Sequence, residues 1–302
     1  MAEATVAKLK VTEEKQNVGQ SLTALALRRI RRDKLTLLAI ATILILTLLS
    51  ATAPLITSVL NVSHTRTNSE NTFAPIGAPG HLLGTDDLGR DHLARLLYAG
   101  QVSLSVGFLA AALSLVIGVS LGIVTGYYGG VTDDLVNWLI ATLSSIPSLF
   151  LLIIVAAVLR PSTETLILVL GFLGWMGTTR LVRGETLSLR EREYIISARA
   201  IGANPLRIMF SHILPNLISI IIVTLMLDIG GLILTEAGLS FLGLGIKPPT
   251  PSWGNMLTGA QGFFRLGPHL VFFPGLLIFI TVLSLYVIGD GLRDAFDPTT
   301  KD

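Results

Sequence analysis

Few side chains in this sequence are of types that could catalyse a reaction or bind a metal. Cysteine is absent, which excludes disulfides, thiolate metal sites and cysteine nucleophiles. The five histidines lack the i, i+4 spacing with a nearby carboxylate that is typical of a metal site; they are His64, His81, His92, His212 and His269. The sequence has no G-x-S-x-G motif and no dyad of carboxylates within its apolar segments. It therefore predicts no metal, no bound cofactor and no enzymatic activity.

The segment Gly84–Asp91 has two glycines five residues apart, as a phosphate-binding loop does. The lysine and the Ser or Thr that such a loop needs for phosphate and magnesium are replaced by Arg90 and Asp91. We therefore expect no nucleotide site in this chain. The charges of the segment, which include Asp86 and Asp87, predict either a turn with local ion pairs before a helix or a surface that a partner protein contacts.

Asp228 lies near the middle of a long apolar segment, where an ionised carboxylate costs about 2.5 to 3.5 kcal/mol or more. It should therefore face a cavity or a partner group. One hypothesis is that it lines a translocation pathway and binds a cationic part of a solute; the other is a protonated or hydrogen-bonded residue between helices. Glu236, at the outer end of the same segment, is expected to reach water, and Trp175 and Trp253 are expected to anchor the chain at membrane interfaces.

The elements that must position these residues are apolar segments of membrane-spanning length. Of the 302 residues 51% are hydrophobic and only 14% are charged, and the mean hydropathy is +0.70. A soluble domain carries about 25% charged residues, so lipid must cover part of this surface. A membrane-spanning helix needs about 20 apolar residues. The segments that meet or approach this length are Leu35–Ile56, Ser103–Tyr127, Leu135–Leu159, Glu164–Thr179, Leu217–Thr235 and Leu270–Gly289.

These segments predict an all-α polytopic membrane protein with about six transmembrane helices. Pro147 should bend the third span, because proline removes a hydrogen-bond donor and clashes with the preceding turn. Gly118, Gly122 and Gly126 form a small-xxx-small pattern, which predicts either a close helix contact or relaxed packing against lipid.

The distribution of Lys and Arg predicts that both termini are cytoplasmic. With the N-terminus inside, sixteen of the 22 cations lie on the cytoplasmic side. The remaining six are Arg66, Arg90, Arg95, Arg160, Lys247 and Arg265. Because the cations are divided among loops and do not form one basic face, nucleic acid is excluded as a partner.

The predicted organisation follows from this topology. Residues 1–34 form a cytoplasmic segment, 35–56 the first span, 57–97 an external loop, 98–291 a core of five spans, and 292–302 a cytoplasmic tail. The core includes a long cytoplasmic connection, 181–216, which predicts two short helices. The first ends near Gly202 as a left-handed cap, and the second begins with Asn204 as cap and Pro205 in its first turn. Pro215 should end or bend the second helix. A basic amphipathic helix on the membrane surface is the alternative for this stretch.

The cytoplasmic connection resembles the EAA loop of permease subunits of bacterial ABC importers. Ser197-Ala198, then Gly202, then Ile213-Leu214-Pro215 match the spacing of that motif, although Ile196 stands where the family has Glu and Ser197 where it has the first Ala. Segments 81–91 (HLLGTDDLGRD), 236–254 (EAGLSFLGLGIKPPTPSWG) and 289–298 (GDGLRDAFDP) resemble signatures of the peptide and nickel class of that family.

The resemblance implies a type I ABC importer transmembrane fold in a bacterial inner membrane. It implies a homologous second permease, two ATP-binding subunits that hold ATP and Mg²⁺, and an extracytoplasmic substrate-binding protein as partners. In such permeases the loop forms a coupling helix that docks on the ATPase. The residues that would carry this role here are Glu193, Tyr194, Ser197, Ala198, Arg199, Ala200, Gly202, Ala203 and Pro215.

A stand-alone secondary transporter or channel is the alternative function. Such folds are expected to have inverted repeats and several ionisable groups near the membrane midplane, whereas this sequence has Asp228 and no repeat. Which solute crosses, whether a dipeptide, an oligopeptide, a nickel chelate or an oligosaccharide, is left open by the sequence.

Overall fold

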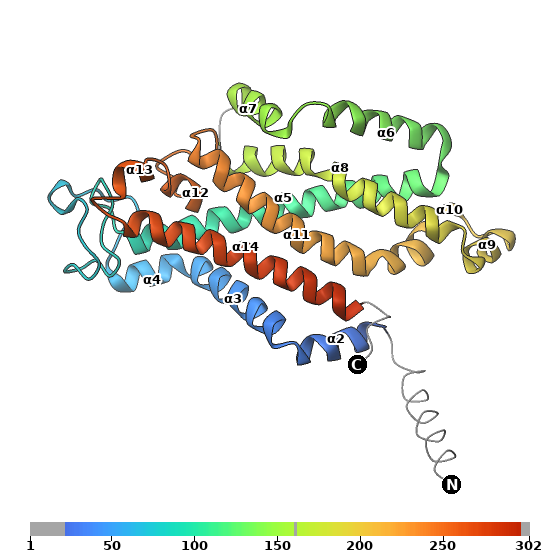
Figure 1. Ribbon diagram of the computed structural model, residues 1–302, viewed down its shortest axis with the longest axis horizontal. Helices are drawn as coiled ribbons and strands as arrows, with labels where there is room; N and C mark the ends of the chain where they lie inside the picture. The colour runs from blue at the N-terminus through green and yellow to red at the C-terminus, as the bar shows by residue number, and fades with distance from the viewer. Residues whose placement is uncertain (1–21, 160–161, 297–302) are drawn as a thin grey trace, which may run out of the picture.

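The computed structural model describes residues 22–159 and 162–296, and these residues form an all-helical protein (Figure 1). The segment before residue 22, the tail after residue 296 and Arg160 lie outside them. In chain order the elements are α2 (Leu22–Arg32), α3 (Lys34–Ala51), α4 (Ala53–Leu60), a 3₁₀ turn (Ser69–Asn71), α5 (His92–Tyr128), α6 (Gly130–Ser144), α7 (Ser148–Val158), α8 (Thr163–Arg190), α9 (Glu193–Ala200), α10 (Pro205–Arg207), a π-helix (Ile208–Ile213), α11 (Leu214–Phe241), α12 (Trp253–Met256), α13 (Ala260–Phe263) and α14 (His269–Phe296).

Four long helices, α5, α8, α11 and α14, form the bundle, and α3 packs along α14 and α5 (Figure 1). The short helices α9 and α10 lie at one end of the bundle. The loop 61–91, α12 and α13 lie at the other end, with α4 leading into them. The hydrophobic core between α3, α5, α11 and α14 includes Ala99, Leu104, Ile233, Trp253 and Leu285, all buried. The bundle therefore separates two sets of short elements, one at each of its ends.

Five helical segments of the described chain are long and apolar enough to cross a membrane, and a bent pair raises the number to six. This confirms the predicted all-α polytopic class. The bent pair is α6 and α7, whose axes differ by 81° at the break that contains Pro147. Proline therefore breaks this span, because α6 ends at Ser144 and α7 begins at Ser148. In addition α8 continues to Arg190, so the first ten residues of the predicted connection 181–216 are helical extension of the span.

The glycine pattern of α5 is a helix contact. A Cβ on any of the three glycines would lie only 2.6–2.7 Å from the Cβ of a residue on α8, so larger side chains would separate the two helices. The meeting pairs are Gly118 with Thr178, Gly122 with Val182, and Gly126 with Thr186. The predicted close contact is confirmed, and relaxed packing against lipid is wrong for this stripe. Small residues here set the distance between α5 and α8.

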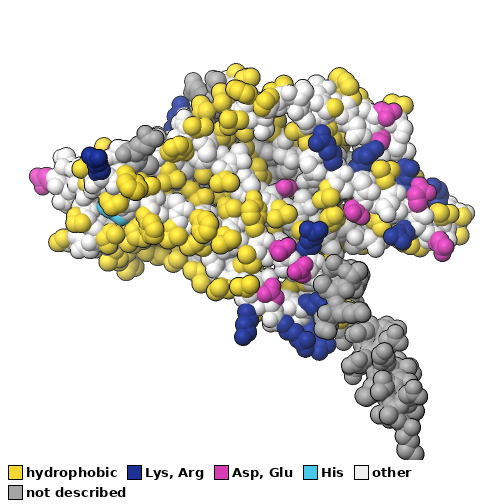
Figure 2. Space-filling view, viewed as in Figure 1, with side chains coloured by type: hydrophobic (Ala, Val, Ile, Leu, Met, Phe, Trp, Pro, Cys, Tyr) yellow, Lys and Arg dark blue, Asp and Glu magenta, His cyan; other side chains and the backbone are white. Residues whose placement is uncertain are grey.

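The outer surface of the bundle is apolar in its middle and charged toward one end (Figure 2). Exposed apolar side chains follow α3 and α14, as Leu38, Leu44, Leu48, Phe272 and Phe279 show. In the view of Figure 2 the Lys, Arg, Asp and Glu side chains gather around α9 and α2. This distribution is typical of a protein whose middle faces hydrocarbon and whose one end faces water.

Candidate functional site

The first candidate surface is α9 at the tip of the bundle, which is held by a complete C-terminal cap. Gly202 has φ +85°, a left-handed conformation that favours glycine. Its N–H donates to the carbonyl of Arg199 (3.0 Å), and the N–H of Ala203 donates to the carbonyl of Ala198 (3.0 Å). These two bonds are the Schellman motif. The predicted glycine cap is confirmed.

The chain turns directly from α9 into a second helix. The Asn204 side chain accepts a hydrogen bond from the N–H of Leu206 (3.0 Å), and Pro205 occupies the first turn, as predicted. A π-helix (Ile208–Ile213) follows and leads straight into α11. It lies immediately before Pro215, where a wider turn gives room for the proline ring and its missing donor. Pro215 therefore does not end the helix; it stands exposed in the first turn of α11.

Buried apolar contacts fix α9 to the three helices above it. Ile195 of α9 is fully buried in a cluster with Ile123 of α5, Val182 of α8, Ile213 of the π-helix and Leu217 of α11. Because these side chains come from three different spans, displacement of α9 must displace all of them.

Two arginines add polar links to the end of α5. Arg190 Nη1 donates to the carbonyl of Gly126 (3.0 Å), and the Arg199 guanidinium lies 5.6 Å from the centre of the Tyr127 ring. Such a cation–π contact adds to the packing that holds α9. Arg190 thus joins the end of α8 to α5, and Arg199 joins α9 to α5.

The exposed face of α9 is partly apolar. Ile201 is 86% exposed, and Tyr194 and Ile196 are 45% and 49% exposed. Of the predicted docking residues in α9 and its cap, the exposed ones are Glu193, Tyr194, Ser197, Arg199, Ala200 and Gly202. Ala198 is buried and Ala203 is half-buried, so these two support the face from within. Ile201, the last residue before the left-handed turn at Gly202, protrudes from the tip.

Asp228, the second candidate, lies half-buried between α11 and α8. Its Oδ2 accepts a hydrogen bond from Thr178 Oγ1 (3.1 Å), and the described part of the chain places no cation within ion-pair distance. Thr178 belongs to the same stripe of α8 that meets Gly118. The contact supports the predicted interhelical hydrogen bond, and it leaves the second carboxylate oxygen, Oδ1, available to a ligand.

A third polar centre, at the end opposite α9, was not predicted. Glu236 is fully buried and its carboxylate accepts hydrogen bonds from Ser103 Oγ (3.0 Å) and Ser240 Oγ (2.7 Å). Ser103 Oγ in turn accepts from the N–H of Trp253 (3.1 Å), and the Trp253 ring N–H donates to the carbonyl of Leu96 (3.1 Å). This group of residues, the Glu236 cluster, joins α5, α11 and α12.

The Glu236 cluster corrects two expectations. Glu236 does not reach water, and Trp253 is buried and not an interfacial anchor, because the segment 242–252 folds back and covers both. Trp175 is buried as well. A signal was present in the sequence: Ser240 follows Glu236 by one helical turn, so the two side chains lie on one face.

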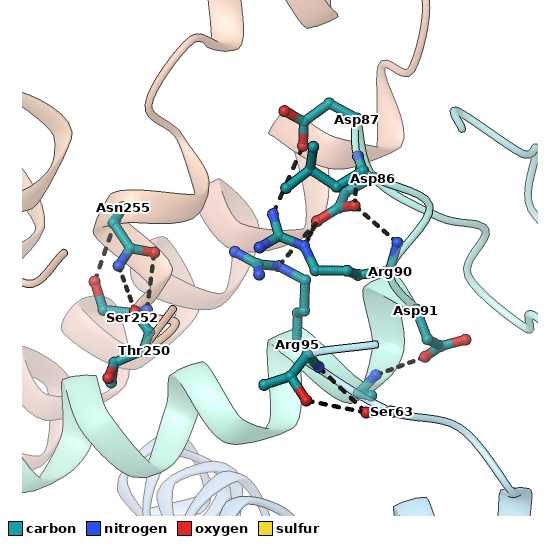
Figure 3. Close-up of polar contacts among 12 residues, drawn as sticks. Ser63, Asp86, Asp87, Arg90, Asp91, Arg95, Thr250, Ser252 and Asn255 are labelled. Carbon is teal, nitrogen blue, oxygen red and sulfur yellow. Dashed lines mark hydrogen bonds and ion pairs between the residues drawn. The ribbon is translucent and has the colours of Figure 1, made fainter. Parts of the chain in front are cut away.

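The charged segment before α5 pairs with itself (Figure 3). Asp86 Oδ2 accepts from Arg90 Nε (2.7 Å) and lies 3.2 Å from Arg95 Nε, and Asp86 Oδ1 accepts from the N–H of Arg90 (2.9 Å). Asp91 caps α5 by accepting from the N–H of Ala94 (2.7 Å). The predicted turn with local ion pairs before a helix is confirmed, although most of its charges are buried. Asp87 remains 39% exposed at the surface of this end.

Comparisons with known proteins agree with this architecture. The family model of the binding-protein-dependent transport system inner membrane component matches residues 118–302. The dipeptide transport system permease protein DppC of Alkalihalophilus pseudofirmus is 40% identical over 91% of this chain and 90% of its own length. The oligopeptide transport system permease protein OppC of Bacillus subtilis is 37% identical over 91% of this chain and 89% of its own length. The glutathione transport system permease protein GsiD of Pectobacterium atrosepticum is 42% identical over 73% of this chain and 73% of its own length.

A solved structure shares the fold. A chain of the MetNI methionine ABC transporter, in an inward-facing conformation, superposes with a TM-score of 0.53. The superposition covers 67% of this chain and 96% of that chain at 19% identity. It supports the type I importer fold. Together with the 40% identity to a permease over most of the length, it establishes that the chain belongs to the family of binding-protein-dependent ABC importer permeases, the inner membrane components of these transport systems.

Proposed function

We propose that this permease subunit carries peptides or related small solutes, and that α9 transmits the motion of a separate ATPase to the bundle. The solute class is supported by the names of the relatives, which are dipeptide, oligopeptide and glutathione permeases. The role of α9 is supported by one observation above all. It is an exposed, capped helix whose buried side is packed against α5, α8 and α11.

The proposed machine has four kinds of subunit. Two ATP-binding subunits sit at the α9 end and hold ATP and Mg²⁺, and a second, homologous permease completes the pathway. A substrate-binding protein docks at the end that carries the loop 61–91. In this arrangement the α9 end and both termini are cytoplasmic, and the membrane is the bacterial inner membrane.

The proposed mechanism is a population shift between two arrangements of the bundle. ATP draws the two ATPase subunits together, α9 moves with the surface on which it docks, and the spans attached to it rotate between inward-open and outward-open states. Each nucleotide state favours one arrangement, because α9 stays docked while the ATPase surface that holds it changes position. The apolar tip, Tyr194, Ile196 and Ile201, would fill a groove on the ATPase.

Asp228 is proposed to line the pathway. Its Oδ2 is held by Thr178 from α8, which fixes the carboxylate in one orientation. The other oxygen could then accept from a cationic or N–H group of the solute, such as the amino terminus of a peptide. The interhelical role does not exclude this one, because the two oxygens serve different partners.

The docking proposal is tested by a charge placed at the tip of α9. Ile201→Glu should leave the chain folded, since Ile201 is 86% exposed, but it should lower co-purification of the ATPase subunits and solute uptake at least about tenfold. Leu82→Glu, at a 60% exposed apolar residue of the opposite end, is the matched control and should retain the ATPase. Normal co-purification and uptake with Ile201→Glu would remove the docking surface assigned here.

The stand-alone transporter is separated from this proposal by reconstitution. The purified chain alone in vesicles should move no solute under an ion gradient. Vesicles that contain both permeases and both ATPase subunits should move solute when the binding protein and ATP are present. Uptake by the single chain without a nucleotide-hydrolysing companion would favour the ion-coupled alternative.

A further inference from the structure

The helix α2, which precedes the first span, carries a dense group of cations and no acidic residue. Its sequence is LTALALRRIRR, and Lys34 begins α3 two residues later. The single acid nearby is Asp33, between the two helices. Asp33 is already engaged, because it caps α3 by accepting from the N–H of Leu35 (3.0 Å) and from the hydroxyl of Thr36. The hydroxyl of Thr36 lowers the pKa of this carboxyl below its usual value.

One side of α2 is fixed to the protein. Ala26 is buried, and Arg29 Nη1 donates to the carbonyl of Ala295 at the end of α14 (3.4 Å). The helix packs along α14, and the N–H of Asp33 donates to the carbonyl of Arg29 (3.1 Å), so α2 continues almost directly into α3. Contacts with α14 and the direct continuation into α3 therefore hold α2 in place.

The other side of α2 presents unpaired charge. Arg28, Arg31, Arg32 and Lys34 are all exposed, and within residues 22–159 and 162–296 none of the four has an ion-pair partner. Like charges three and four residues apart on a helix repel each other. An anionic partner would relieve this repulsion.

The surroundings of α2 indicate which partner fits. Leu27 is 52% exposed on α2, and Leu35 and Leu38 of α3 are 71% and 65% exposed, so apolar surface begins within one turn of the cations. Figure 1 places α2 beside the end of α14 and set back from the tip of α9, and Figure 2 shows its Lys and Arg side chains along the edge of the body. Cations directly beside an apolar span lie at the depth of the lipid headgroups.

We propose that α2 binds the phosphate headgroups of anionic phospholipids, in the leaflet at the α9 end of the bundle. Arg28, Arg31, Arg32 and Lys34 contact the headgroups, while Leu27 lies against the acyl chains beneath them. Through the contact of Arg29 with α14, bound lipid holds the cytoplasmic end of that span. An acidic surface of a partner subunit is the competing occupant, and it is distinguished by the experiment.

The experiment measures lipid that is retained by the purified full chain. The chain in neutral detergent is titrated with dioleoyl phosphatidylglycerol or dioleoyl phosphatidylcholine, and bound lipid is counted by native mass spectrometry. The wild type should retain phosphatidylglycerol in preference to phosphatidylcholine, and the preference should fall as salt rises. The triple variant R28Q/R31Q/R32Q should lower the affinity for phosphatidylglycerol about tenfold or more and leave phosphatidylcholine unchanged.

Two further variants make the outcome decisive. R66Q/K247Q/R265Q removes the same number of exposed cations at the opposite end and should retain the wild-type preference. R28K/R31K/R32K keeps the charge and should retain most of it. The proposal is overturned if the α2 variant and the wild type bind phosphatidylglycerol equally, if the control variant loses it to the same extent, or if the α2 variant loses the ATPase subunits while its lipid binding is intact.

Discussion

At the scale of single residues, Glu236 is the side chain whose burial differs most from the prediction. Polar residues at the outer end of a span usually reach water, and no local pattern shows that segment 242–252 folds back over the helix. The sequence did identify the local partner Ser240, one turn away. Ser103, which comes from a different span 133 positions earlier, could not be predicted without the packing of α5 on α11.

Loss of the Glu236 carboxylate should destabilise the end of the bundle opposite α9. Glu236→Ala leaves the hydroxyls of Ser103 and Ser240 without their acceptor in a buried site, at a cost of about 1–3 kcal/mol. Glu236→Gln keeps one acceptor oxygen and should cost less. Thermal unfolding of the purified complex measures both, with Glu185→Ala at an exposed acid of α8 as control. Equal midpoints for Glu236→Ala and wild type would show that the cluster contributes nothing to stability.

Asp228→Asn separates the two hypotheses for the midplane carboxylate. The amide oxygen of Asn can still accept from the Thr178 hydroxyl, so expression and thermal stability should change little. If Asp228 binds a cationic part of the solute, loss of the charge should lower uptake about tenfold or more. Uptake by the reconstituted transporter is the measurement. Full activity at normal expression would leave Asp228 with the interhelical role alone.

At the scale of elements, the cap of α9 was predictable because it depends on neighbours in sequence. Gly202, Asn204 and Pro205 each act within a few residues, and the structure places all three as their types indicated. The depth of each α9 side chain was not predictable in the same way. Ile195 and Ile201 are equally apolar, yet Ile195 is buried among three spans and Ile201 protrudes. Ile201 is exposed because it directly precedes the left-handed turn at Gly202, which separates α9 from the second helix.

The left-handed turn after α9 gives a graded test of coupling. A Cβ at Gly202 would meet nothing within 4 Å, so Gly202→Ala strains only the backbone, by about 1–2 kcal/mol. Gly202→Pro also removes the N–H that donates to Arg199 and cannot adopt φ +85°. Insertion should be normal in both, while the proline variant hydrolyses ATP without uptake. Gly184→Ala on α8, with open space and helical φ, is the control.

The contact between α5 and α8 should be intolerant of any added side chain. A Cβ at Gly122 would lie 2.7 Å from Val182 Cβ and 2.9 Å from the carbonyl of Thr179, which is backbone and cannot move aside. Gly122→Ala should therefore lower the thermal midpoint and the yield of folded protein. Gly177→Ala has nothing within 4 Å of its Cβ and should not. An unchanged midpoint for Gly122→Ala would mean that the two helices can separate without cost.

At the scale of the whole molecule, the fold class followed from the length and number of the apolar segments. Four of the six predicted spans lie within single helices, and each of these helices extends beyond its apolar part. The first predicted span, Leu35–Ile56, runs from α3 across Thr52 into α4. The third span is broken at Pro147. This was not predictable, because the sequence indicates that a proline bends a helix but not by how much. Hydropathy detects the part of a helix in lipid, whereas the ends of α8 and α5 are defined by contacts with other parts of the protein.

The length of α5 has a mechanical consequence. Its 37 residues extend about 55 Å, and the last turns contact Arg190 and Arg199 near α9 while the first turns hold Trp253 in the Glu236 cluster. One uninterrupted helix thus joins both ends of the bundle, so a torque applied to α5 near α9 reaches the Glu236 cluster with no other element between them. A hinge midway along α5 would let each end of the bundle move while the other stayed still.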